Sequence, residues 1–107
     1  MPIVTLAELR GHLGLTAGVA EADDAMLERN IAAAQGFIES WLGHRIAERY
    51  GGDGQEPVPD ALRLAVLQLA AWWYEHREAA TRGERAVPAP FAVRDIIDAY
   101  RDRSFWA

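Results

Sequence analysis

The sequence contains no cysteine and no lysine, and both absences narrow what this chain can do. Without cysteine it has no disulfide, no thiolate nucleophile and no cysteine-based zinc site. All 11 basic residues are arginine, whose guanidinium suits protein interfaces, although the codon bias of a GC-rich genome also enriches arginine. The 16 acidic residues leave a net charge of -5, which argues against a basic face that grips a phosphate backbone.

No hydrophobic run is long enough to cross a membrane. The longest, from Leu64 to Tyr74, is interrupted by Gln68 and falls short of the roughly 20 residues that a span needs. The first residues lack the basic segment and cleavage site of a secretory signal, so we expect synthesis in the cytoplasm. A length of 107 residues, 50% of them hydrophobic and 25% charged, predicts one folded domain over residues 1–107.

Hydrophobic spacing predicts an all-α fold, a small bundle of about four helices. The first begins at a capping box, in which the Thr5 hydroxyl and the Glu8 carboxylate serve each other's backbone amides, and runs to about Leu13. The second begins at Asp23 and is closed by Gly43. Its apolar residues recur at helical spacing and predict the face toward the core: Met26, Leu27, Ile31, Ala34, Ile38, Trp41 and Leu42.

The third helix is predicted to be the central helix of the domain. It opens at Pro59, continues to about Arg82, and is apolar around most of its circumference until Glu75. A helix of this kind has to be covered from at least two sides. We expect its core side chains to be Leu62, Val66, Leu69 and Trp73.

Two further segments complete the predicted architecture. The last helix follows a proline-rich connector and runs from Phe91 to about Arg103. Its inward face is predicted to hold Val93, Ile96, Ile97 and Tyr100. Residues 44–58 join the second and third helices and are rich in glycine, which predicts a flexible loop or hairpin; the alternation from Arg45 to Tyr50 also fits a short strand.

Patterns that carry catalysis or bind a metal are scarce. No histidine stands at metal-ligand spacing from another: the three are His12, His44 and His76. Glu75 and Glu78 are three residues apart, but a di-metal site in a bundle needs Glu-x-x-His partners that the sequence lacks. The glycines from Gly51 to Gly54 precede no Lys-Ser or Lys-Thr of a phosphate-binding loop. We therefore expect no catalytic residue, no cofactor and no metal.

Four segments taken together resemble the phage head-tail connector family of the gp6 type, whose members are also called adaptor or head-completion proteins. The segments are residues 4–13, 27–43, 58–79 and 87–101. The most specific part is WYEHRE at 73–78, where the family has a Trp-Tyr-x-x-Arg-Glu run. Next comes PFAV at 90–93, which opens a helix that closes with Tyr100 and Arg101. The resemblance covers nearly the whole chain and extends to prophage and gene transfer agent relatives.

The resemblance implies a structural adaptor, with no enzymatic activity, in the neck of a virion or phage-like particle. Such adaptors form a ring, usually dodecameric, that joins the portal protein to a tail or stopper protein. DNA passes through the channel of the ring without sequence-specific binding, and no membrane is involved. The alternative is a small helical regulatory or DNA-binding module, but neither long helix presents the polar and basic side chains that read a DNA groove.

This reading assigns candidate roles to eight residues. A ring is built by a head-to-tail contact between two different patches of each subunit. With Trp73 assigned to the core, Trp72 or Tyr74 is expected to face outward, and Arg77 and Glu78 lie one turn beyond, so these four are the candidate subunit interface.

The other four candidates lie in the central loop and at the end of the sequence. Asp53 and Glu56 are the candidate channel lining, because acidic walls let DNA slide without sticking. Phe105 and Trp106 are the candidate portal-docking residues, since two large aromatics so close to the end of the sequence are expected to dock against a partner.

Overall fold

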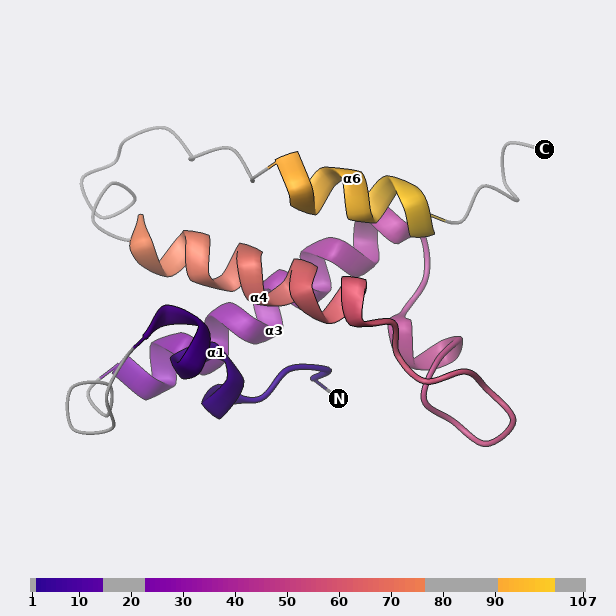
Figure 1. Ribbon diagram of the computed structural model, residues 1–107, viewed down its shortest axis with the longest axis horizontal. Helices are drawn as coiled ribbons and strands as arrows, with labels where there is room; N and C mark the ends of the chain where they lie inside the picture. Colours follow the sequence, from indigo (N-terminus) through magenta and orange to yellow (C-terminus); the bar gives the residue numbers. More distant parts are fainter. Residues whose placement is uncertain (1, 15–22, 77–90, 102–107) are drawn as a thin grey trace.

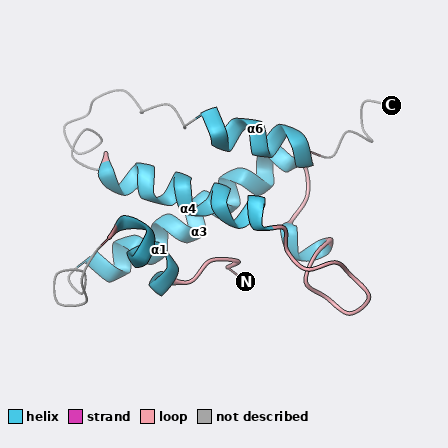
Figure 2. Cartoon of the chain, in the orientation of Figure 1, coloured by secondary structure: helices cyan, strands magenta, loops and turns pink. Residues whose placement is uncertain are grey.

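Four α-helices make up the fold in the part of the chain that the computed structural model describes, residues 2–14, 23–76 and 91–101 (Figure 1). They are α1 (Leu6–Leu13), α3 (Asp24–Leu42), α4 (Asp60–Glu75) and α6 (Phe91–Tyr100). A short 3-10 helix, η2 (Ile46–Glu48), lies between α3 and α4, and these residues contain no strand (Figure 2). The predicted all-α fold of about four helices is confirmed.

Short-range chemistry sets where α1 and α3 begin and end. The predicted capping box is present: the Thr5 hydroxyl accepts from the Glu8 amide at 3.1 Å, and the Glu8 carboxylate accepts from the Thr5 amide at 3.1 Å. Gly43 closes α3 with φ of 88°, a left-handed conformation that glycine adopts without the steric penalty of a Cβ atom. The predicted helix boundaries at these residues are confirmed.

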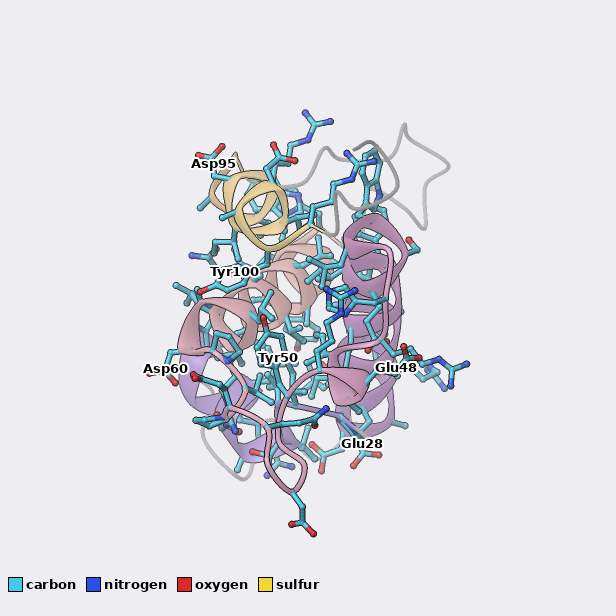
Figure 3. The ribbon with its side chains drawn as sticks, turned by 90° about the vertical axis from the view of Figure 1, so that its right-hand side faces the viewer. Glu28, Glu48, Tyr50, Asp60, Asp95 and Tyr100 are labelled. Atoms are coloured by element: carbon cyan, nitrogen blue, oxygen red, sulfur yellow. The ribbon has the colours of Figure 1, made fainter. Side chains whose placement is uncertain are left out.

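The helix α4 is central, as predicted, because α1, α3 and α6 all pack on it. In Figure 1, α4 runs in front of α3, with α1 below it and α6 above it. The side view in Figure 3 separates α3 from the layer that holds α4 and α6. The helices therefore form two layers, α3 alone in one and α1, α4 and α6 in the other. The extents of 45 × 32 × 18 Å describe a thin plate.

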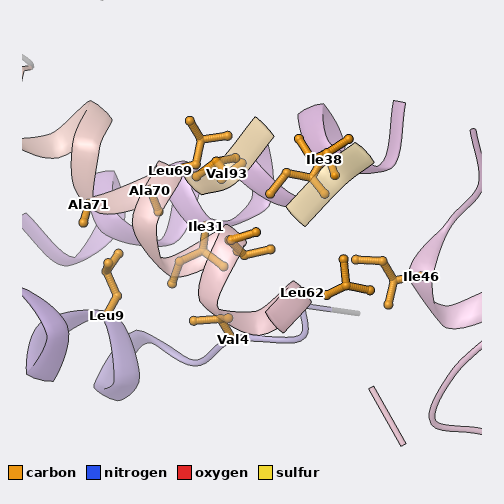
Figure 4. Close-up of a cluster of buried hydrophobic side chains, with 14 of the residues drawn as sticks. Val4, Leu9, Ile31, Ile38, Ile46, Leu62, Leu69, Ala70, Ala71 and Val93 are labelled. Atoms are coloured by element: carbon orange, nitrogen blue, oxygen red, sulfur yellow. The ribbon is translucent and has the colours of Figure 1, made fainter. Parts of the chain in front are cut away.

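The core fills the space between the two layers, where side chains from every helix converge (Figure 4). Its fully buried members include Leu9, Leu27, Ile38, Ile46, Leu62, Leu69 and Val93. Each buried side chain of this size contributes about 1.5–3 kcal/mol relative to leaving it exposed. The predicted inward face of α6 is confirmed, since Val93 and Ile97 are buried and Ile96 and Tyr100 pack partly buried against them.

Two tryptophans lie outside the core position that the sequence predicts for them. Trp41 is 47% exposed, because the core-facing arc of α3 is filled by residues such as Ile38 and Leu42 and the neighbouring position points about 100° away. Trp73 is only partly buried and packs at the edge of the core. The Trp41 and Trp73 rings therefore lie at the edge of the fold and not in its interior.

The connection between α3 and α4 also differs from one prediction. The short strand considered as an alternative for Arg45 to Tyr50 is not formed, because this stretch contains η2 and buries Ile46. The Glu39 carboxylate accepts a hydrogen bond from the Ile46 amide at 2.7 Å and helps fix the turn. The loop that follows has a single isolated bridge between Tyr50 and Glu56.

The predicted ends of the two later helices extend past the described segments. The structure ends α4 at Glu75, and the continuation predicted to Arg82 lies outside the described residues. It ends α6 at Tyr100; Arg101 is described and is not helical, and residues 102–103 of the predicted continuation lie outside the described residues.

A glycine inside α3 and the glycine that closes this helix are expected to respond to alanine in opposite ways. Gly43→Ala forces a side chain into the left-handed region and should cost about 1 kcal/mol of unfolding free energy. Gly36→Ala lies inside the helix, where a Cβ would meet nothing within 4 Å, and should stabilise by about 0.5–1 kcal/mol. Thermal unfolding followed by circular dichroism measures both. A loss of stability in the Gly36 variant would contradict the open outer face of α3.

Candidate interaction surfaces

The start of α3 is fastened to α1 and α4 by two carboxylates. The Arg10 guanidinium donates to both oxygens of the Asp24 carboxylate, with its Nε 3.1 Å from Oδ1. The Tyr74 hydroxyl donates to Asp23 Oδ2 at 2.6 Å. The sequence predicts these acids only as favourable charges at a helix N-terminus. Their side chains also hold three helices together.

Of the two residues predicted as alternatives for the outward position, Tyr74 is the one that does not take it. Its side chain is 8% exposed and its hydroxyl donates a hydrogen bond to Asp23, so Tyr74 belongs to the core of the fold. The physical reason is that the side of α4 carrying Tyr74 faces the first turn of α3. Of the other interface candidates, Trp72 is partly exposed, and Arg77 and Glu78 lie outside the described residues.

Trp72 stacks on the histidine that follows it by one helical turn. The two ring centroids are 4.1 Å apart, and His76 Nδ1 lies 2.8 Å from the Trp72 carbonyl oxygen, which can only accept a hydrogen bond. The indole Nε1 of Trp72 is buried and has no hydrogen-bond partner within the described segments. The histidine is therefore packed against an aromatic ring and capping a carbonyl, where the sequence suggests only a surface position.

An aromatic patch, formed by Phe37, Trp41 and Trp73, lies where α3 meets α4. The Phe37 ring sits 6.1 Å from each of the two indoles, tilted toward Trp41 and edge-on to Trp73. The Arg101 guanidinium lies 6.0 Å from the Trp41 ring centroid. Phe37 is 39% exposed, so the patch presents apolar surface of the kind that marks contact sites.

Sequence reasoning missed Phe37 as a surface residue, although the helical spacing contains the signal. Phe37 precedes the buried Ile38 by one position, which turns it about 100° away from the core-facing arc. Trp41 follows Phe37 by four residues and therefore falls on the same side of α3. Two large aromatics at this spacing just off the core arc form an exposed pair.

The two acidic loop candidates are exposed on a hydrogen-bonded turn. Asp53 and Glu56 both lie on the surface of the loop that projects from one end of the plate (Figure 1). The Gly51 amide donates to the Glu56 carbonyl at 2.8 Å, and the Gln55 side-chain amide donates to the Glu48 carbonyl at 2.7 Å. These bonds leave both carboxylates free to face an external partner. The candidates Phe105 and Trp106 lie outside the described residues.

Exposed apolar and charged side chains are the main surface features of the described residues. Among them, no three His, Asp or Glu side chains come together in a group that could hold a metal ion. None of the helices in this part of the chain has both the length and the apolar character that a membrane crossing requires. The surfaces described above are therefore the features from which a function can be argued.

The chain matches a known protein family along most of its length. Residues 3–101 match the family model described as phage gp6-like head-tail connector protein. This range contains all four α-helices of the fold. Neither the curated proteins nor the solved structures give a significant match.

The contribution of the hydrogen bond between Tyr74 and Asp23 to stability can be tested by mutation. Tyr74→Phe keeps the ring but removes the hydrogen bond to the Asp23 carboxylate, and should lower the unfolding free energy by about 1–2 kcal/mol. Urea unfolding measures the loss. Trp41→Phe, on the exposed patch, is the matched control and should change stability by less than about 0.5 kcal/mol. Equal stability of the Tyr74 variant and the unaltered protein would contradict the assignment.

Proposed function

Because the chain belongs to the phage gp6-like head-tail connector family, we propose that it forms a ring in the neck of a phage or phage-like particle. The ring joins the portal protein to the tail or stopper protein, most simply with twelve copies, and encloses a channel for DNA. The observation that carries this proposal is the family match over residues 3–101, which spans the whole described fold.

The shape and surface of the fold support assembly by contact. A ring of identical subunits requires two different patches on each subunit. The plate has two broad faces, and large apolar side chains are exposed on the chain: Phe37, Trp41 and Leu64. Trp72, Arg77 and Glu78 remain proposed contributors to subunit contacts. An exposed ion pair that Arg77 or Glu78 makes with a neighbouring subunit contributes less than about 1 kcal/mol to binding. Such pairs act mainly by fixing how the two subunits are aligned.

The proposed roles of the loop and of the chain end concern the partners of the ring. Asp53 and Glu56 line the channel in this proposal, since exposed carboxylates repel the phosphates of passing DNA. Phe105 and Trp106 dock on the portal protein, where burial of each ring would contribute roughly 2–3 kcal/mol before ordering costs.

Imaging of purified particles that carry a labelled copy of the chain tests the proposal. The label should appear at the neck, between portal and tail, in every intact particle. Intact, tailed particles that lack the label would overturn the proposal, whatever the behaviour of the isolated protein.

Reversing both loop charges tests the channel assignment. Particles that carry Asp53→Lys with Glu56→Lys should eject DNA more slowly, because two cations per subunit then attract the phosphates. The matched control is Glu48→Lys with Asp95→Lys, which makes the same charge change at exposed positions elsewhere. Ejection kinetics followed by dye fluorescence compare the two. Equal ejection rates would remove Asp53 and Glu56 from the channel.

Removing Phe105 to Ala107 tests the docking assignment. The deletion should leave helical circular dichroism unchanged, because the described core contains none of these residues. Portal binding in a pull-down should be lost. A Phe105→Tyr, Trp106→Phe variant, which keeps both aromatic rings, should retain binding. Full binding by the deleted chain would refute the assignment.

A further inference from the structure

No other described helix covers the outer face of α3, although Pro2 lines a pocket beside Ala32 and Gly36 at one edge of it. This helix forms a layer by itself, and its side away from α4 carries small exposed side chains (Figure 3). They are Ala25, Ala32, Ala33, Gly36 and Ser40. Phe37 and Trp41 stand along one border of this face, and Arg29 is the one cationic residue of the helix. Small side chains bordered by large aromatics let another helix approach closely and still bury apolar area.

The opposite broad face of the plate carries a second strip, on α4, that is exposed at its two ends. Leu64 is 42% exposed, and Gln68 and the exposed Glu75 lie within about 40° of it around the helix. Between these ends Ala71 is buried, and the Gln68 Oε1 atom is buried without a hydrogen bond within the described segments. The strip has an apolar residue at one end and a carboxylate at the other. It forms the outer face of α4, pointing away from α3.

We propose that the outer face of α3 receives the outer face of α4 from the next copy, and that this contact repeats head to tail around the ring. The inference rests on the proposed adaptor function and names the surfaces through which the ring forms. Since the two faces lie on opposite sides of one thin plate, each copy can use both at once. A contact between unlike faces builds rings, whereas pairing of two α3 faces would stop at a dimer.

The spacing of charges and apolar residues matches between the two faces. Arg29 and Ser40 are separated by the same number of residues as Leu64 and Glu75, which is about 16 Å along each helix. In an antiparallel arrangement, Glu75 then lies opposite Arg29. Leu64 lies opposite Ser40, beside the Phe37 and Trp41 rings.

Charge also favours this pairing over self-association of the α4 face. The outer face of α4 carries Glu75 and, near its start, Asp60, so two copies of it would bring carboxylates together. Arg29 on the outer face of α3 supplies the complementary charge. Opposite charges at the border of an apolar contact select the partner and its register more than they add affinity.

The cysteine-free sequence allows this contact to be tested by engineered disulfides. A Ser40→Cys, Leu64→Cys variant should give, on oxidation of particles, a ladder of covalent dimers, trimers and higher multimers on a non-reducing gel. Each single variant should give no ladder. An Ala7→Cys, Leu64→Cys variant, which moves the first thiol to an exposed position on α1, is the matched control and should give none.

The outcomes separate the inference from the function on which it rests. Particles that contain the variant chain at the neck but yield no ladder would overturn the assignment of faces and leave the adaptor function standing. Dimers from Ser40→Cys alone would show that two α3 faces pair, which also overturns it. Particles that exclude the unaltered chain would overturn both.

A charge exchange tests the register. In the double-cysteine background, Arg29→Glu or Glu75→Arg alone should lower the yield of the ladder about fivefold. The combined exchange should restore the yield, since opposite charges then face each other again. A combined variant that is no better than either single variant would contradict the antiparallel register.

Discussion

The structure depends on one constraint, which is that α4 is apolar around almost its whole circumference. Exposing such a helix to water would cost a large amount of free energy, and the other helices pack over it. The helix α3 covers it from behind, and α1 and α6 flank it within its own layer. Within the described part of the chain, Leu64 is the large apolar side chain of α4 that stays exposed, and the proposed contact with a second copy would cover it.

The same arrangement explains why the fold is thin and why its function is one of contact. Two layers of helices enclose one core, and the exposed large apolar side chains of the described residues are Phe37 and Trp41 on α3 and Leu64 on α4. Two partly buried carboxylates hold the start of α3 against its neighbours. Asp23 accepts a hydrogen bond from Tyr74 of α4, and Asp24 forms an ion pair with Arg10 of α1. A plate with unlike faces suits the head-tail connector family to which the chain belongs, whose role is structural.

Much of the fold could be predicted from the sequence because local rules dominate it. The Thr5 and Glu8 capping box, the closing Gly43 and the central place of α4 follow from spacing and residue type alone. Apart from the short strand considered for residues 45–50, the errors concern adjacent residues of a helix: Trp41 beside Leu42 on α3, and Trp73 beside Tyr74 on α4. Which of two adjacent aromatics faces inward depends on where the other helices pack. A single sequence does not contain that information. The choice of the outer faces of α3 and α4 as contact surfaces likewise depends on how the helices pack in two layers.

A reconstruction of the particle neck at a resolution that separates helices is the decisive measurement. It should show a closed ring of this chain between portal and tail, with α3 of each copy lying against α4 of its neighbour. A neck whose ring is built from another protein, with this chain absent from it, would refute the adaptor role.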